Sequence, residues 1–346
     1  MKDAPSGPSA RVTMKDVARA AGVSQSTVSF VLNGAEEMRI GAETRTRVMA
    51  VAAELGYRPR SAGRPPDPGT YRVLGVMVDE IATSPFAAIS IEAMQEAAWS
   101  AGIMLEIVMT GGDRGYEAAA LRKWAADRVQ GVVYGSILTR RVVPPRGLSR
   151  HRAVLLNCYD AEGRYPSIVP AERRGGEAAT RALVEAGHRR IAFVSGEPWM
   201  EASSQRQEGY ERALLQAGRT VDPKLIAEGN FMPSGGRVAT QRLMAGSAPP
   251  DAIFCANDLM ALGCYEALRD LGLGIGSDVA VIGYDDQEIA QHVDPPLSTV
   301  LLPHREMGAL AVDILLSPEG PAAEQHRIAC PLVLRRSHGS GDRAPG

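Results

Sequence analysis

Five side chains near the N-terminus share one face of a short predicted helix. Ser26, Ser29, Phe30 and Asn33 recur at helical spacing, and Gln25 lies beside them where the helix begins. Hydroxyl and amide groups can hydrogen-bond to base edges in the major groove, and an apolar ring can contact thymine methyl groups. Phe30 lies opposite the apolar stripe of the same helix, so its spacing favours contact with DNA over burial. The face therefore predicts a surface that reads duplex DNA.

Three short helices are expected to position this face. Thr13 begins a capping-box pattern for a first helix, which Gly22 ends. Ser24 can cap a second helix over residues 25–32, and a third helix is predicted over residues 43–55. The residues expected to be buried are Val28, Val31 and Leu32 in the second helix and Val48, Val51, Ala52 and Leu55 in the third. This pattern predicts an all-α helix-turn-helix headpiece over residues 12–58.

The charge of this segment differs from that of the whole chain. The 346 residues have a net charge of −2, but residues 1–66 hold ten Lys or Arg against six Asp or Glu. A basic excess suits the phosphate backbone of a nucleic acid. Lys15, Arg39, Arg45 and Arg47 are candidates for phosphate contacts, although single charges of this kind are also common on a solvated surface.

A linker rich in Pro, Gly and Arg is predicted over residues 59–70, and an α/β module follows over residues 71–336. In that module apolar strands alternate with amphipathic helices, which predicts parallel sheets covered on both faces. Because a single core stops growing near about 250–300 residues, we expect two doubly wound lobes. The N-lobe is expected at about 71–168 and 300–325, and the C-lobe at about 169–298 and 326–336.

The individual elements follow from the same alternation of patterns. The strands are predicted at residues 73–78, 103–109, 131–134, 153–157, 191–195, 252–255 and 279–283. The helices of the α/β module are predicted at residues 87–101, 116–127, 172–186, 206–217, 236–244, 259–271 and 304–316.

Polar side chains follow several of these strands, where a parallel sheet binds ligands. They are Asp79, Asn157, Asn257, Asp258, Asp285 and Asp286. Amide and carboxylate groups beside an aromatic ring suit the hydroxyl groups and apolar faces of a sugar. Asp258 and Asp286 are expected instead to cap the helices that follow them. Phe231 is interpreted as stacking on a ligand, with core packing as the alternative, and Trp199 as either closing the pocket or covering a lobe surface.

Other classes of protein are disfavoured. The cysteines are scattered and read as reduced thiols of a cytosolic protein: Cys158, Cys255, Cys264 and Cys330. No apolar run approaches the length of a membrane span, and residues 1–11 lack the hydrophobic segment of a signal peptide. We find no catalytic motif, no phosphate loop and no cluster of metal ligands, so we expect neither enzymatic activity nor a cofactor or metal.

The headpiece resembles that of the lactose-repressor (LacI/GalR) family. The resemblance lies in the stretch VTMKDVARAAGVSQSTVSFVLNG and in RIGAETRTRVMAVAAELGYRP. It implies a dimer, or a pair of dimers, that reads a near-palindromic operator, with Gln25, Ser26 and Phe30 facing bases. The residues expected to contact DNA are Met14, Lys15, Ser24, Gln25, Ser26, Thr27, Ser29, Phe30, Asn33, Arg39, Arg60 and Arg64.

The α/β module resembles the effector module of the same family, so the similarity covers about residues 12–336. LVEAGHRRIAFVSG, RQEGYERAL, FCANDLMALG and VAVIGYDDQEIAQHVDPPLSTV carry it, in the same order. It implies a two-lobed fold like that of periplasmic binding proteins. Arg206, Phe231, Asn257 and Asp285 match the family's ligand-contacting positions, and Phe86 and Asn157 match more loosely. With Trp199, these form the expected effector site.

The linker departs from the family pattern. Members of the family place a short hinge helix after Tyr-x-Pro, with a leucine wedged into the minor groove. Here Pro66 stands where the leucine is expected, and proline disfavours a helix. We therefore expect the linker to contact DNA through Arg60 and Arg64 without intercalation.

These observations predict a cytoplasmic transcription regulator, and a repressor in particular, that a small sugar-like effector controls from between the two lobes. The helices at residues 86–100 and 304–316 are candidates for the dimer contact. A sugar-binding transport protein is disfavoured by the headpiece and by the lack of a signal peptide. A sugar-active enzyme fused to a DNA-binding domain is disfavoured by the missing catalytic groups.

Overall fold

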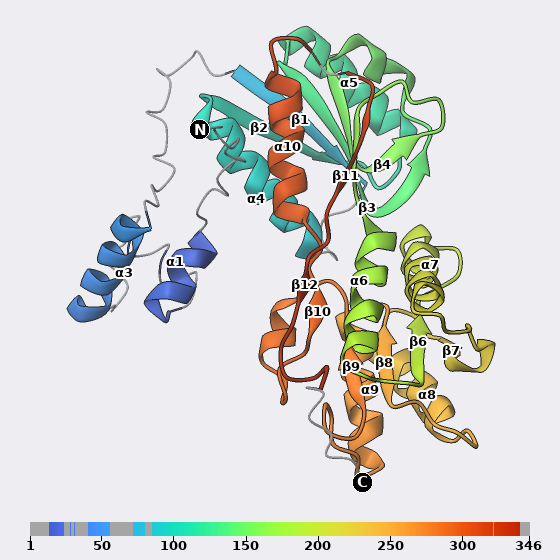
Figure 1. Cartoon of the computed structure of the whole chain (residues 1–346). Helices are drawn as coiled ribbons and strands as arrows, with labels where there is room; N and C mark the ends of the chain where they lie inside the picture. Colours follow the sequence, from blue (N-terminus) through green and yellow to red (C-terminus); the bar gives the residue numbers. More distant parts are fainter. Residues whose placement is uncertain are drawn as a thin grey trace, which may run out of the picture. The chain divides into compact units, whose positions relative to one another are not determined.

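The computed structural model describes residues 14–23, 28, 31, 41–55, 72–79, 85–320 and 322–339 (Figure 1). These residues belong to two compact units, the headpiece and the α/β module. Most of the predicted DNA-reading face lies outside the described residues: Ser24, Gln25, Ser26, Thr27, Ser29, Phe30, Asn33, Arg39, Arg60 and Arg64.

The described part of the headpiece has the expected helices and core. Its helices are α1 (Met14–Ala21) and α3 (Ala42–Glu54), and Gly22 ends α1 with a positive φ of 64°. Val28, Val31 and Val48 are buried as predicted. The prediction for Leu55 is wrong, because this residue follows the last turn of α3 and is 37% exposed.

The N-lobe contains a six-stranded parallel sheet in the order β11-β5-β4-β3-β1-β2. The strands are β1 (Arg72–Val78), β2 (Ile103–Met109), β3 (Gly131–Val142), β4 (Ala153–Asp160), β5 (Ser167–Pro170) and β11 (Gln325–Ile328). The helices are α4 (Pro85–Ser100), α5 (Arg114–Asp127), η1 (Arg146–Arg150) and α10 (His304–Leu316). The fully buried ring of Trp124, on α5, packs against Gly75 of β1, where a Cβ would lie only 2.7 Å from the indole.

The C-lobe contains a four-stranded parallel sheet in the order β7-β6-β8-β9. The strands are β6 (Ile191–Ser195), β7 (Ile226–Glu228), β8 (Ala252–Cys255) and β9 (Ala280–Ile282), with an antiparallel pair of β10 (Thr299–Val300) and β12 (Leu332–Val333). The helices are α6 (Glu172–Glu185), α7 (Glu201–Gln216), η2 (Pro223–Leu225), α8 (Pro233–Met244), α9 (Asp258–Asp270) and η3 (Glu288–Gln291). The lobe's apolar core includes the buried rings of Phe193, Tyr210 and Phe254.

Glycines allow the helices of the C-lobe to pack closely in pairs. A Cβ on Gly209 of α7 would lie 2.2 Å from the carbonyl oxygen of Arg173 on α6, and one on Gly176 would lie 2.4 Å from that of Arg206. In the same way α8 and α9 approach each other at Gly236. The helix backbones therefore touch without intervening side chains, which leaves little room for movement within each pair.

The predicted parallel, two-lobed architecture is confirmed, and each predicted strand and helix of the α/β module has an observed counterpart. The short strands β5, β7, β10, β11 and β12 were not predicted. Residues 326–328, which we assigned to the C-lobe, belong instead to β11, the edge strand of the N-lobe sheet. The chain thus crosses between the lobes after β5, after β10 and after β11. No helix within the described ranges is long and apolar enough to cross a membrane.

We predict that Gly209→Ala destabilises the C-lobe by about 1–3 kcal/mol, because the added methyl group must push α6 and α7 apart. Urea unfolding of the full chain measures this effect. Gly246→Ala is the matched control, since its Cβ would meet only one atom, the carbonyl oxygen of Leu243 at 3.3 Å. Equal stability of the two variants would contradict the close packing described above.

Candidate effector site

The strand order identifies where a ligand can enter each lobe. In the N-lobe, β2 lies on one side of β1 and β3 on the other, and in the C-lobe β7 and β8 flank β6 in the same way. Such a reversal of strand order opens a crevice beyond the carboxyl ends of the strands, because the connections leave to opposite faces of the sheet. The polar residues predicted from the sequence lie at these ends.

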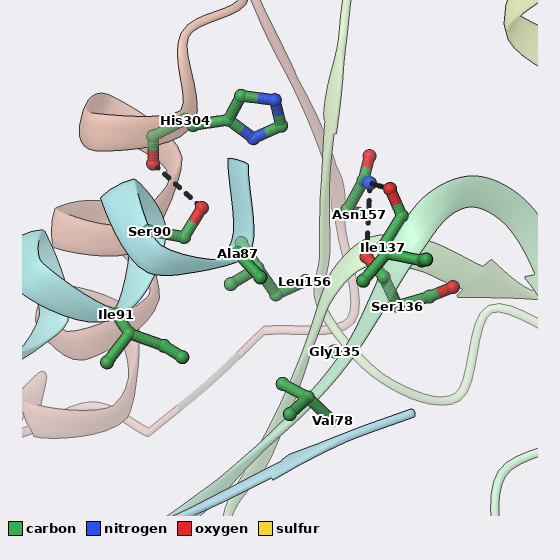
Figure 2. A pocket seen from close by; sticks show the side chains of 10 residues that line it. All are labelled: Val78, Ala87, Ser90, Ile91, Gly135, Ser136, Ile137, Leu156, Asn157 and His304. Carbon is green, nitrogen blue, oxygen red and sulfur yellow. Dashed lines mark hydrogen bonds between the residues drawn. The ribbon is translucent and has the colours of Figure 1, made fainter. Parts of the chain in front are cut away.

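In the N-lobe the crevice is a small pocket bounded by β1, β3, β4, α4 and α10 (Figure 2). Asp79 follows β1 and joins it to the far half of β3. Its carboxylate accepts hydrogen bonds from Ser136 Oγ at 2.8 Å, from the backbone N–H of Ile137 at 3.0 Å and from Arg140 at 2.7 Å. These contacts fix the backbone where β3 departs from regular pairing with β4.

Asn157 lies in β4 with a positive φ of 55° and is buried. Its amide donates to the carbonyl oxygens of Ser136 and Ile137, both at 3.1 Å (Figure 2). The amide oxygen accepts from Thr139 Oγ1 at 2.6 Å. Both amide hydrogens are therefore engaged within the protein. Asn157 lines this pocket, and its hydrogen bonds support the shape of the wall.

His304 lines the same pocket from the start of α10, where its carbonyl oxygen accepts a hydrogen bond from Ser90 of α4 (Figure 2). Burial, together with the charge of Arg206, lowers the pKa of His304 to about 4. The imidazole is therefore neutral at physiological pH. The sequence predicts His304 only as part of a candidate dimer helix, because no sequence signal marks it as a residue of the site.

In the C-lobe the site is organised around Arg206 of α7, which is only 3% exposed. Its guanidinium forms a two-pronged ion pair with Glu172, at 2.8 and 3.0 Å, and contacts Asp285 at 3.3 Å. It also donates to the carbonyl oxygen of Ala256 and stacks on the ring of Tyr284, 3.8 Å from the centroid. Burial opposes the charge of Arg206, but Glu172 and Asp285 outweigh it and raise the pKa of the guanidinium.

Asp285 follows β9 and is 6% exposed. One oxygen contacts Arg206, and the other accepts from the Gln287 amide at 3.2 Å. Burial raises the pKa of Asp285 to about 7, against the opposing effect of Arg206. The carboxyl group can therefore act as an acceptor or, when protonated, as a donor near neutral pH.

Three more predicted residues lie at the carboxyl ends of C-lobe strands. Asn257 caps α9 by accepting from the Met260 N–H at 2.9 Å, and its amide donates to the carbonyl oxygen of Phe231 at 3.0 Å. The Phe231 ring is half-buried, packs on the lobe core and lies directly against Gly196. Trp199, in the loop between β6 and α7, is 71% exposed. The backbone of Phe86 lies in α4.

The expected capping roles of Asp258 and Asp286 are wrong. Asn257 caps α9, whereas the buried Asp258 accepts from Thr299 Oγ1 at 2.6 Å and from the Gln287 N–H at 2.8 Å. Asp286 forms an ion pair with Arg335 at 2.6 Å. Both carboxylates thus tie the end of the C-lobe sheet to distant segments. Sequence reasoning also missed Glu172, because it lies in an arginine-rich stretch without a recognisable motif.

Backbone strain gathers at these strand ends. Five non-glycine residues within the described ranges have a positive φ, and four of them are Asn157, Phe231, Asp285 and Asp286. A left-handed conformation is rare for a bulky residue such as phenylalanine, and it persists only where surrounding contacts enforce it. Residues of this kind concentrate at ligand-binding sites. The strain therefore marks the same region that the strand order identifies.

Comparison with known proteins decides the family. Residues 13–60 match the family model described as bacterial regulatory proteins, lacI family, and residues 180–338 match the periplasmic binding protein-like domain. The ribose operon repressor of Haemophilus influenzae is 34% identical over 94% of this chain and 98% of its own length. The chain belongs to the lacI family of bacterial regulatory proteins. As a lacI-family protein it is a DNA-binding transcription regulator and not an enzyme.

Further relatives agree along almost the whole chain. The HTH-type transcriptional repressor PurR of Vibrio atlanticus is 36% identical over 94% of this chain and 98% of its own. The structure of the lac repressor dimer bound to operator and the anti-inducer ONPF superposes with a TM-score of 0.67, at 28% identity, over 96% of this chain and all of that one. The structure of the CelR–cellobiose complex gives 0.65 at 29% identity, over 94% of this chain and all of that one.

We predict that Arg206→Met lowers the free energy of unfolding by about 3–5 kcal/mol at pH 7.5, because Glu172 and Asp285 lose their buried counter-charge. Chemical denaturation measures the loss. Arg212→Met, on the same helix, removes an exposed guanidinium that pairs with Glu177 and should cost at most about 1 kcal/mol. Similar losses in the two variants would show that the buried cluster does not hold the fold together.

The raised pKa of Asp285 predicts a pH dependence of stability. A free aspartate titrates near about 4, so between about pH 4 and pH 7 the folded state holds a proton that the unfolded state has released. Stability from this residue is then present below pH 4 and lost as the pH rises towards 7. Asp285→Asn cannot ionise, so its stability relative to the wild type should rise between pH 5 and pH 7, by up to about 1 kcal/mol per pH unit. If the stabilities of the variant and the wild type change by the same amount with pH across this range, the assignment is refuted. Asp270→Asn, at an exposed aspartate, is the control.

Proposed function

We propose that the regulator binds a sugar-like effector between the carboxyl ends of its two parallel sheets, and that the effector controls binding of operator DNA. The residues proposed to contact the effector are Phe86, Asn157, Trp199, Arg206, Phe231, Asn257 and Asp285. The observation that carries this proposal is the buried pair of Arg206 and Asp285 at the carboxyl ends of the C-lobe strands, where the half-buried Phe231 also follows a strand.

The chemistry of this pair favours a hydroxyl group. The contact between Arg206 and Asp285 is 3.3 Å, the longest of the guanidinium's four polar contacts, and is the one that a ligand can most readily exchange. A hydroxyl can donate to the carboxylate while it accepts from the guanidinium. An anionic ligand would instead meet Glu172 and Asp285, which already balance the charge of Arg206. Aromatic faces beside such polar groups suit the apolar faces of a sugar ring.

Two of the related proteins are named for sugars, the ribose operon repressor and the CelR–cellobiose complex. Both names support a sugar or sugar derivative as the effector of this chain. The seven proposed residues divide by their present contacts. Asn157 and Asn257 are held by hydrogen bonds that shape the site, whereas the exposed Trp199 has most of its surface available for a ligand.

Transmission from the site depends on the segments that cross between the lobes. Glu172 follows the crossing after β5, and the backbone of Asp285 bonds to Val300 and Leu302 at the crossing after β10. A ligand that competes for Arg206 therefore acts on both segments. The effector shifts the equilibrium between lobe arrangements by its difference in affinity for them. The paired headpieces would respond with altered spacing on the DNA.

The DNA-reading role is assigned to the second helix of the headpiece, with base contacts from Gln25, Ser26, Ser29, Phe30 and Asn33. Met14, Lys15, Ser24, Thr27 and Arg39 would add contacts near the groove, and Arg60 and Arg64 would bind phosphates from the linker without a wedge. We propose a cytoplasmic homodimer, or a pair of dimers, that represses transcription at a near-palindromic operator. The structural relative bound to an operator is a dimer.

The dimer contact is proposed on α4 and α10. These helices touch at Gly308, where a Cβ would lie 2.3 Å from the carbonyl oxygen of Ser90, and Arg305 pairs with Glu92 and Glu96. They therefore form one joint surface on the N-lobe.

The effector proposal is tested by a thermal-shift screen of the full chain against neutral sugars, sugar phosphates and purines. We expect a neutral sugar to raise the melting temperature, since a ligand at 100 times its Kd adds about 2.7 kcal/mol of stability. The same sugar should change the affinity for a duplex selected from a random pool. Trp199→Ala should weaken sugar binding without lowering the melting temperature of the free protein. Tyr116→Ala, which removes an exposed aromatic ring on α5, should leave both sugar binding and the melting temperature unchanged. Stabilisation by anions alone, or no change in duplex affinity, would refute the proposal.

A further inference from the structure

A second recess lies at the amino ends of the N-lobe strands, opposite the candidate effector site at their carboxyl ends. It has a cavity volume of about 390 Å³ and lies between the end of α5 and the turn from η1 into β4. The amino ends of β3 and β4 are neighbours at this end of the sheet, since Val132 pairs with Ala153. Its volume falls within the range of small-ligand pockets, roughly 300–1,000 Å³.

The side chains that line the recess are strongly cationic. Three of them are arginines, Arg128, Arg150 and Arg152, and none of the lining residues is acidic. Arg128 and Arg150 form no salt bridge with any residue that the structure describes. Asp127, the acid next to Arg128, is engaged with Lys123 at 2.7 Å. The positive charge of the recess is therefore not balanced by the protein itself.

Two of the lining side chains are already held in place. Arg152 donates to the carbonyl oxygen of Ser317, and His151 Nε2 lies 3.2 Å from that of Leu121. The Trp124 ring is fully buried, and its indole N–H has no hydrogen-bond acceptor among the residues that the structure describes. The indole nitrogen is itself enclosed by protein atoms, so the donors that a ligand in the recess can reach are those of the arginines.

The backbone at Arg128 gives an independent indication. This residue ends α5 in the left-handed region, with φ 55° and ψ 48°, and is the fifth strained non-glycine residue of the described ranges. Glycine usually occupies such a position because it has no Cβ. An arginine here costs stability, which indicates that its side chain has a use other than ending the helix.

We infer that this recess binds a phosphate group. Planar guanidinium groups match phosphate oxygens in pairs, and the three arginines of the recess supply donors around one anion. The group can come from a free phosphorylated metabolite or from the backbone of DNA. DNA is a relevant source because β1 begins at the same end of the sheet, where the Gln130 N–H donates to the carbonyl oxygen of Val73. In the sequence, the headpiece precedes β1.

The first arm of the test titrates inorganic phosphate into the full chain at constant ionic strength and follows binding by calorimetry. We expect saturable binding that weakens at least tenfold in Arg150→Gln. Arg181→Gln removes the same charge from an exposed site on α6 and should leave the affinity unchanged. The second arm measures duplex affinity against salt concentration. If DNA supplies the phosphate, the slope of log K against log salt should fall by about 0.9 in Arg150→Gln and stay constant in Arg181→Gln.

Arg128→Gly separates binding from folding. Because glycine relieves the strained backbone, the melting temperature should stay constant or rise while phosphate or duplex binding weakens. The inference is overturned if wild type shows neither saturable phosphate binding nor a slope that depends on Arg150. It is also overturned if Arg181→Gln weakens binding as much as Arg150→Gln does, or if Arg128→Gly lowers the melting temperature.

Discussion

The buried guanidinium of Arg206 holds together segments that are far apart in the chain. It comes from α7 and contacts Glu172 at the start of α6, Ala256 at the end of β8 and Asp285 beyond β9. Removing charges from water costs several kcal/mol per ion, so such a cluster persists only with good geometry and paired hydrogen bonds. The two-pronged pair with Glu172 and the stacking on Tyr284 supply that geometry. The carboxyl end of the C-lobe sheet depends on this cluster for its shape.

Close helix packing adds a second constraint. Backbone contacts at Gly209 and Gly236 join α6 to α7 and α8 to α9, so each helix pair is stiff. The crossings between the lobes are short segments compared with these helix pairs. Two of them lie next to members of the Arg206 cluster, Glu172 and Asp285. Movement within the α/β module is therefore expected in the crossings, while the lobe itself moves as a body.

Much of the fold could be predicted from the sequence, because long strands and helices carry strong periodic patterns. Strands 103–109, 191–195 and 252–255 were predicted with the bounds observed. The missed strands, such as β10 and β12, span only two residues, and their pairing depends on tertiary contacts that leave no local pattern. The same limit explains the lobe boundary, since residues 325–328 join β5 across a long stretch of sequence.

The candidate site was predictable in its position but not in its internal contacts. Asn157 lies near the carboxyl end of β4 and Asn257 and Asp285 follow β8 and β9, which is where the rule for parallel sheets places a ligand site. Glu172 and His304 could not be found in this way, because their roles arise from Arg206 and from α4, which fold to them from elsewhere. The capping roles assigned to Asp258 and Asp286 failed for a related reason, since Thr299 and Arg335 compete for their carboxylates.

The position of β11 has a consequence for synthesis of the chain. The strands and paired helices of the C-lobe sheet are complete by Ile282, but the N-lobe sheet gains its last strand only when residues 325–328 have been made. Until then one side of β5 has unpaired backbone groups, which can pair with other extended chains. On the ribosome the six-stranded sheet of the N-lobe, though begun first, is thus completed later than the four-stranded sheet of the C-lobe, and nascent chains that stop short of Ile328 would expose an edge strand prone to aggregation.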